Sequence, residues 1–139
     1  MADTVTPKRR SEIMSNIRAK GMKPEMAIRR LTHAMGYRYQ LHRKDLPGKP
    51  DLVFPGRRKV IFMHGCFWHQ HPDATCKIAR LPQSNRHYWL PKLERNVTRD
   101  AEHQARLAEL GWEVLVIWEC DVVASDGIAD RIRDFLERN

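Results

Sequence analysis

A short stretch in the middle of the chain concentrates side chains that bind metals. Residues 64–76, with the sequence HGCFWHQHPDATC, contain three histidines and two cysteines. A third cysteine, Cys120, follows an apolar run near the end of the chain. Thiolates and imidazoles are ligands that suit Zn²⁺, and a Cys₃His set is a common tetrahedral structural site. These residue types therefore predict a zinc-bound loop over residues 64–76.

The predicted zinc ligands are Cys66, His71, Cys76 and Cys120. Equal gaps of four residues separate the first three of them, so one loop can collect them around a single ion. Four protein ligands close the coordination shell, which makes the expected role structural rather than catalytic. Metal binding would also order a loop that has little apolar content. Two alternatives stay open: His69 could replace His71, or unrelated cysteines could lie near a surface histidine.

A second set of residues, Asp51, His64 and His69, could hydrolyse a phosphodiester. Asp51 opens a predicted strand directly after Pro50, and its carboxylate is a hard oxygen ligand suited to a divalent cation. A histidine close to that cation could transfer protons near neutral pH. Together with the excess of Lys and Arg near the start of the chain, described below, this set indicates phosphodiester hydrolysis. Taken singly, each residue has a simpler explanation. Asp51 could cap a turn, His64 could be a satisfied histidine at a strand end, and His69 could be a surface residue.

Two aromatic residues, Phe67 and Trp68, lie between the predicted metal ligands. Large apolar side chains on a polar loop are costly in water unless they are buried or have a partner. A stiff, metal-bound loop could push such rings between base pairs, and unstacking costs less at a mismatch. The alternative is that Phe67 packs beneath the loop. Trp112 and Trp118 alternate with apolar strand residues, so we expect both in the core.

Hydrophobic periodicity indicates the elements that position these side chains. Predicted helices cover residues 23–36, about 91–111 and 126–139, and predicted strands cover residues 37–43, 51–54, 58–65 and 112–120. This α-βββ-αβ-α order predicts an α/β fold with a mixed four-stranded sheet flanked by helices. The long helix should join the last two strands as a parallel right-handed crossover. Since parallel strands end at one edge of the sheet, Cys66 and Cys120 can meet there.

The excess of positive charge lies at the start of the chain. The 139 residues suit one domain, with a formal net charge of +8. Residues 1–50 contain 12 Lys and Arg against 4 Asp and Glu, whereas the remaining residues contain 13 of each kind. We expect a basic DNA-binding arm or helix over residues 1–22, ahead of a catalytic domain over residues 23–139. A solvated basic face is the simpler alternative.

The composition also bears on the compartment. The start of the chain, MADTVTPKRR, is polar and basic, and no apolar run approaches the roughly 18 residues of a membrane span. Three cysteines is an odd number, which argues against a complete disulfide framework. We therefore expect a soluble cytoplasmic protein without membrane partners, whose thiols are reduced or metal-bound.

Four segments together resemble the very short patch repair (Vsr) endonucleases: LPGKPDLVF, VIFMHGCFWHQH, YWLPKLERNVTRD and LGWEVLVIWEC. The resemblance extends over roughly residues 8–137. It implies a restriction-endonuclease-like fold and a Mg²⁺-dependent enzyme. Such an enzyme nicks DNA 5′ of the thymine in a T:G mismatch, the product of 5-methylcytosine deamination. It also implies cooperation with mismatch-repair and polymerase proteins, and nicking one strand requires only a monomer.

The resemblance assigns roles to individual residues. It implies that Asp51 and the backbone carbonyl of Met63 bind Mg²⁺, that His69 is the general acid and base, and that His64 orients water or phosphate. Glu25 would bind metal-coordinated water, although an acid in the first turn of a helix is also favoured by the helix dipole. The implied DNA contacts are Phe67, Trp68 and Trp89 as intercalating rings, with Met14 and Ile17 at the minor groove.

The sequence departs from the wider nuclease superfamily in one respect. That superfamily places a second acid and a lysine on the strand after its aspartate, whereas Lys59 comes too early here. Vsr-like enzymes share this difference, with histidine transferring the proton. Threonine is frequent in relatives at the position of Met63. The length of the zinc loop also varies across the family, which affects the assignment of Cys76 more than that of the other ligands. The alternatives are a nicking nuclease with another lesion or sequence preference and an inactive, zinc-dependent DNA-binding module.

Overall fold

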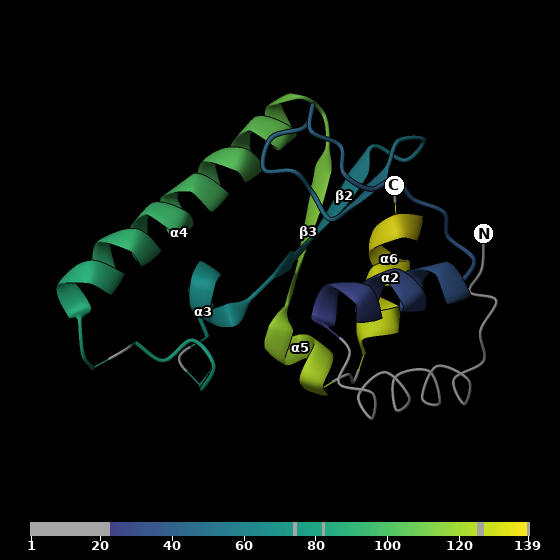
Figure 1. Ribbon diagram of the computed structural model, residues 1–139. Coiled ribbons are helices and arrows are strands. Elements are labelled where there is room, and N and C mark those ends of the chain that lie inside the picture. The colour runs from purple at the N-terminus through teal and green to yellow at the C-terminus, as the bar shows by residue number, and fades with distance from the viewer. Residues whose placement is uncertain (1–22, 74, 82, 125–126, 139) are drawn as a thin grey trace.

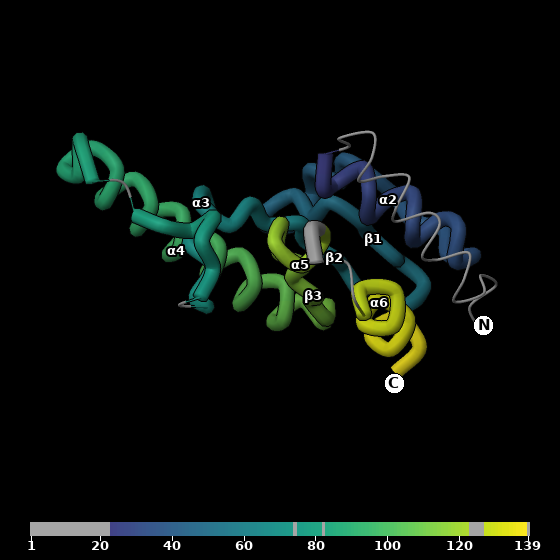
Figure 2. The backbone as a smooth tube through the Cα atoms, turned by 90° about the horizontal axis from the view of Figure 1, so that it is seen from below, coloured from purple at the N-terminus to yellow at the C-terminus, as the bar shows by residue number. Residues whose placement is uncertain are grey.

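The computed structural model describes residues 23–73, 75–81, 83–124 and 127–138. Its centre is a three-stranded sheet in the order β1-β2-β3. Helix α4 covers one face of the sheet, and helices α2 and α6 cover the other (Figures 1 and 2). No helix in the described ranges combines the length and the apolar character that a membrane crossing requires.

The sheet contains one antiparallel and one parallel pair of strands. Strand β1 (Leu52–Phe54) pairs antiparallel with β2 (Lys59–His64), and β2 pairs parallel with β3 (Glu113–Trp118). Helix α4 (Arg86–Glu109) connects the parallel pair. The predicted parallel connection is therefore confirmed, and it aligns His64 with Trp118 at the end of the two strands.

Side chains alternate between two cores along these strands, as the two-residue period of a strand requires. Ile61 and Ile117 face the core with α2 and α6, whereas Val60 and Phe62 face Leu107 of α4. Helix α2 (Pro24–Ala34) begins with a proline, whose fixed φ suits a first turn, and buries its predicted apolar face. Helix α6 (Ile128–Glu137) also buries its predicted face. That face consists of Ile128, Ile132, Phe135 and Leu136.

The predicted four-stranded sheet is wrong, because the described residues form three strands. Residues 37–43 pair with the sheet through a single antiparallel bridge between Gln40 and Val53, and otherwise contact it through side chains such as that of Tyr39. His42 has a φ of 59°, a left-handed conformation that breaks extended backbone. Strand β1 is itself only three residues long, so it offers little edge for further pairing.

Two short helices and one earlier helix start also differ from the prediction. Helix α3 (Cys66–His69) replaces an expected loop, and α5 (Glu119–Ala124) replaces the expected end of the last strand. Helix α4 begins at Arg86 rather than near residue 91, so Pro91 lies inside it. Proline costs a helix one backbone hydrogen bond. Contacts of the Trp89 ring in this first part of α4 with aromatic rings of α3 offset that cost.

Candidate active site and metal centre

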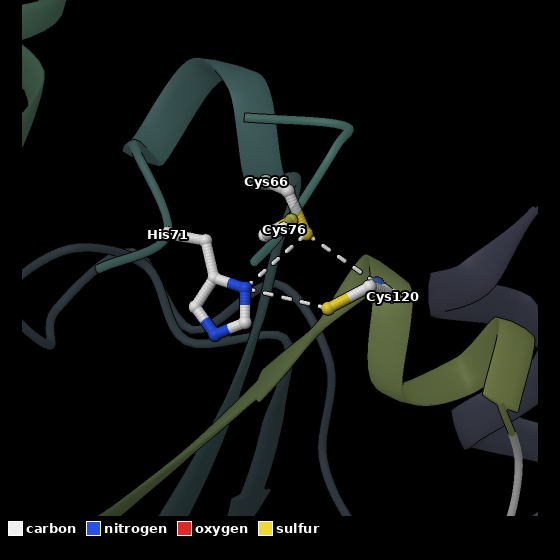
Figure 3. Close-up of side chains that lie close together, drawn as sticks. All are labelled: Cys66, His71, Cys76 and Cys120. Carbon is white, nitrogen blue, oxygen red and sulfur yellow. Dashed lines mark hydrogen bonds between the residues drawn. The ribbon is translucent and has the colours of Figure 1, made fainter. Parts of the chain in front are cut away.

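Three cysteines and one histidine converge at the end of the parallel strand pair. The side chains of Cys66, His71, Cys76 and Cys120 point toward one another from α3, the following loop and the start of α5 (Figure 3). Their four ligand atoms all lie within 4.8 Å of one another. The parallel register places Cys66 and Cys120 just beyond the paired ends of β2 and β3, as predicted.

The spacing of these atoms fits a tetrahedral metal ion. His71 Nδ1 lies 3.3 Å from Cys120 Sγ and 3.8 Å from Cys66 Sγ. Around Zn²⁺, bond lengths of about 2.3 Å to sulfur and 2.0 Å to nitrogen give nitrogen–sulfur separations of roughly 3.5 Å. Burial raises the pKa of Cys66 to about 12 and also raises that of Cys120. These sulfurs therefore carry negative charge at neutral pH only with a cation bound.

Asp51 lies at the start of β1, beside the end of β2. Its Oδ2 accepts a hydrogen bond of 2.6 Å from the backbone N–H of Met63, which leaves Oδ1 for a cation. Burial raises the pKa of the Asp51 carboxyl, the Met63 hydrogen bond lowers it, and the nearby charge of Glu25 raises it further. Glu25, in the first turn of α2, and Asp51 line one pocket. Two carboxylates in a partly buried pocket favour a bound divalent cation.

His64 and His69 stack face to face beside this strand end. Their ring centroids lie 4.0 Å apart with an interplanar angle of 8°. His64 is buried, with 5% of its surface exposed. Burial and the neighbouring His69 lower the pKa of His64 to about 4, so His64 is neutral near pH 7. His69 Nδ1 lies 2.6 Å from Asp100 Oδ2 of α4, an arrangement that orients the imidazole and leaves Nε2 for proton transfer.

Trp118 connects the two groups of residues. Its ring stacks on His71 at 4.4 Å and meets the edge of His64 at 5.1 Å. We predicted a core position for both Trp112 and Trp118, and this is correct for Trp112 alone, because Trp118 is only half-buried. The strand end places Trp118 between the metal centre and the histidine pair.

Comparison with known proteins identifies the family. The family model for the DNA mismatch endonuclease Vsr matches residues 2–75. The type II nicking enzyme V.XorIIP of Xanthomonas oryzae pv. oryzae is 48% identical over 137 residues, which cover 99% of this chain and 98% of that enzyme. The DNA mismatch endonuclease Vsr of Escherichia coli is 37% identical over 130 residues, covering 94% of this chain and 81% of that protein. The chain belongs to the Vsr family.

Membership in the Vsr family makes the chain a DNA endonuclease and DNA its substrate. The mixed sheet flanked by helices is consistent with a restriction-endonuclease-like core. Lys59 takes no part in the site, because its ammonium lies at the opposite end of β2 and donates to the backbone carbonyls of Phe135 and Arg138. The lysine of the wider superfamily therefore has no counterpart on β2 of this Vsr-family chain.

The three predicted intercalating rings form one cluster on the Vsr-family site. Trp89 of α4 contacts Phe67 and Trp68 of α3 edge-on, at centroid distances of 5.5 and 5.7 Å. Trp68 is 47% exposed, and the neighbouring Tyr88 is 57% exposed. Lys92 Nζ lies within 5.9 Å of the rings of Trp68, Tyr88 and Trp89. The remaining predicted DNA contacts, Met14 and Ile17, lie outside the described residues.

Sequence reasoning missed Asp100. The sequence held a signal for it, because residues seven apart share one helix face and Asp100 lies midway between Leu93 and Leu107, which are both buried. A carboxylate on the apolar face of α4 requires a partner, and the structure supplies His69. A second hydrogen bond, from Asn96 Nδ2 to the Trp68 carbonyl at 3.0 Å, also joins α4 to α3.

Proposed function

We propose that this Vsr-family endonuclease nicks DNA 5′ of the thymine in a T:G mismatch by Mg²⁺-dependent hydrolysis. The observation that carries the proposal is the pair of carboxylates Asp51 and Glu25 in one pocket, with His69 of the histidine pair close enough to affect the pKa of the Asp51 carboxyl. It combines oxygen ligands for a hard cation with a proton-transfer group oriented by a carboxylate. A pure DNA-binding module has no need of this combination.

We assign the Mg²⁺ ligands to Asp51 and the Met63 carbonyl, with Glu25 binding coordinated water. When bound, Mg²⁺ supplies positive charge to the scissile phosphate. The N–H and C=O groups of one strand residue point to the same side, as the paired bonds of an antiparallel ladder require. Because the Met63 N–H donates to Asp51, the Met63 carbonyl also faces that carboxylate.

The histidine pair provides the proton chemistry. His69 Nε2 is the atom proposed to take a proton from water and return one to the leaving oxygen, while Asp100 orients the ring through Nδ1. His64 remains neutral near pH 7, so its ring supports His69 by stacking without adding a positive charge. Its free ring nitrogen can then orient water or phosphate, the role we propose for it.

We assign mismatch selection to the aromatic cluster of Phe67, Trp68 and Trp89. Inserting rings into a duplex requires base unstacking, which costs least where pairing is already weak. A Zn²⁺ ion on the four cysteine and histidine ligands would fix Cys66 at the first residue of α3, and so hold Phe67 and Trp68 in place. The proposed zinc role is therefore structural.

A nicking assay tests this proposal directly. A T:G duplex incubated with the protein and Mg²⁺ should be cut on the thymine strand, and the matched T:A duplex should stay intact. Nicking of another mismatch or flanking sequence instead would favour a relative with a different lesion preference. Binding to the T:G duplex without cleavage under any divalent cation would favour the inactive zinc-dependent module and refute the proposal.

A further inference from the structure

A pocket beside Asp51 is lined by basic residues to which the proposed hydrolysis assigns no role. Its volume is about 200 Å³, which accommodates a phosphate group together with several waters of roughly 30 Å³ each. The residues that line it are Glu25, Arg29, His42, Lys44, Lys49, Pro50 and Asp51. The two acids are the proposed metal-binding pair. Three full positive charges therefore border the catalytic carboxylate.

In the described ranges, the two lysines of the pocket are not neutralised by acidic side chains outside it. Asp45, the acid next to Lys44 in sequence, is already neutralised by Arg43, which donates two hydrogen bonds of 2.7 Å to it. Within the described ranges, neither Lys44 nor Lys49 forms an ion pair. With Asp45 occupied, a bound Mg²⁺ that neutralised Glu25 and Asp51 would leave the pocket strongly positive.

Arg29 also has an incompletely satisfied guanidinium. Its Nη1 donates to the weak acceptor Met26 Sδ at 3.5 Å, and its buried Nε makes no hydrogen bond with a described residue. A buried donor without an acceptor is costly, which favours a ligand that brings acceptor oxygens. The positive charge of Arg29 lowers the pKa of the Asp51 carboxyl, whereas burial raises that pKa.

The loop that carries Lys49 is fixed to the body of the protein. Leu46 is buried in the core with Val53 and Leu107. Gly48, at a φ of 78°, lies against the side chain of His103 on α4, where an added Cβ would come within 3.0 Å. Lys49 itself has a φ of 52°, a costly left-handed conformation for a residue with a side chain. The pocket is therefore preformed rather than a chance gathering of mobile lysines.

We propose that this pocket binds a backbone phosphate of the DNA strand that is cut, adjacent to the scissile phosphate. Lysine ammonium groups and an arginine fork are the side chains that phosphate oxygens accept hydrogen bonds from most favourably. Since the pocket shares Asp51 with the catalytic centre, the bound phosphate fixes the register of the strand over that carboxylate. The inference rests on the proposed function, because it takes Asp51 as the place of cleavage.

The salt dependence of DNA binding tests the inference. Binding to the full-length protein is measured with Mg²⁺ present, on a T:G duplex whose scissile linkage is replaced by a non-hydrolysable one, so that no cleavage occurs. In the double variant Lys44→Gln/Lys49→Gln, the slope of log affinity against log salt should decrease by about one for each phosphate that the protein no longer binds. Lys44→Arg/Lys49→Arg should restore the slope. The control is Arg133→Gln on α6, which removes a positive charge outside the pocket and should leave the slope unchanged.

Single-phosphate neutralisation then locates the contact. Methylphosphonate is placed at one backbone position at a time on both sides of the cleavage point. At one position next to that point, neutralisation should weaken binding by the wild-type protein but not by the double glutamine variant. Equal weakening of both proteins at every position, or a variant slope equal to that of Arg133→Gln, would overturn the inference. If such a position exists but no T:G duplex is nicked, the proposed function alone is refuted. If the duplex is nicked but no such position exists, the pocket alone is refuted.

Discussion

At the scale of single residues, the site depends on carboxylates whose environments differ. Asp100 lies on the buried face of a helix and has His69 as its partner, with 2.6 Å between Nδ1 and Oδ2. Asp51 shares its pocket with Glu25 and is held by a backbone N–H. In the proposed mechanism, the first arrangement orients the proton-transfer group and the second forms the cation site. Each makes a separate prediction.

Replacing Asp100 with asparagine should slow nicking while DNA binding stays intact. The amide would keep the side-chain shape but remove the carboxylate that pairs with His69 Nδ1 and orients the ring. We expect the single-turnover rate at saturating enzyme to fall by roughly 10²-fold or more, with the dissociation constant for DNA changed little. Asp134→Asn on the exposed surface of α6 is the control. An equal loss of rate in both variants would contradict the role of Asp100.

Replacing Asp51 with asparagine should abolish nicking and raise thermal stability. Because burial raises the pKa of Asp51, the folded protein binds this proton more tightly than the unfolded chain does. The stability that protonation contributes is present below the ordinary pKa of 3.8 and is lost as the pH rises through the raised value. The amide of the variant stays neutral at every pH. The melting temperature of Asp51→Asn should therefore exceed that of the wild type at pH 7, and the difference should shrink toward pH 3.

Magnesium gives the Asp51 prediction a second readout. Adding Mg²⁺ should raise the melting temperature of the wild type, since a ligand that binds only the folded state stabilises it. The Asp51→Asn variant should respond much less. A wild-type melting temperature that is the same with and without Mg²⁺ would argue against a cation site at this carboxylate.

At the scale of elements, α3 is too short to be stable by itself. It spans four residues, and the contacts outside the helix that order it include the His69–Asp100 pair, the Asn96 hydrogen bond to the Trp68 carbonyl and the rings that Trp89 packs against. A single helical turn gains little from its own hydrogen bonds. Contacts with α4 therefore supply the order that positions the histidine pair and the aromatic cluster, and the proposed zinc ion on the cysteine–histidine cluster would add to it.

Removing zinc should unfold this part of the molecule. Protein purified without chelators should contain one zinc per chain by elemental analysis. The variant Cys120→Ser should lose that zinc and at least about 3 kcal/mol of unfolding free energy. Its tryptophan fluorescence should also change, because Trp118 stacks on His71. Folded, active protein without bound metal would contradict a structural role for the ion.

Truncating the exposed ring of the aromatic cluster should weaken recognition of the mismatch. Stacking of one base on an aromatic side chain is worth about 1–3 kcal/mol, so Trp68→Ala should lower affinity for the T:G duplex about tenfold or more. Affinity for the matched duplex should change less. Leu110→Ala, an exposed apolar side chain at the other end of α4, is the control. Equal losses on both duplexes would argue against insertion of the ring.

At the scale of the whole molecule, positive charge is unevenly divided between the first 50 residues and the remaining 89. The first 50 residues carry the entire net charge, and the remainder is neutral in sum. In the described part of the chain, the basic pocket beside Asp51 belongs to this charged region. The sheet, α4 and the metal centre come from the neutral remainder, which provides the rigid frame.

Neutralising the basic residues of the proposed arm should weaken DNA binding and leave the fold intact. Residues 1–22 contain five Lys and Arg, and the salt slope falls by about 0.9 for each phosphate that the protein no longer neutralises. Replacing all five with glutamine should lower the slope by up to about four, with little change in melting temperature. An unchanged slope would show that residues 1–22 do not contact phosphates.

The amino-acid sequence by itself determined the residue types and their order along the chain. Helical periodicity and the residues at the helix ends were sufficient to predict α2 and α6. The long crossover was sufficient to predict that Cys66 and Cys120 lie at the same edge of the sheet. The convergence of three cysteines with His71 and the approach of Asp51 to the end of β2 could also be inferred, because local spacing and strand direction decide them. Asp51 and Cys66 also lie within the motifs that resemble those of Vsr endonucleases.

Tertiary structure alone decided the partners that lie far apart in the sequence. Only packing of α4 on α3 joins Asp100 to His69, and only the strand ends place Trp118 between the two groups of the site. The left-handed backbone at His42 limited the sheet to three strands in the described residues. These features depend on contacts between elements whose energies no local pattern records. The basic pocket beside Asp51 likewise combines residues of α2 with the loop at Gly48, which lies against His103.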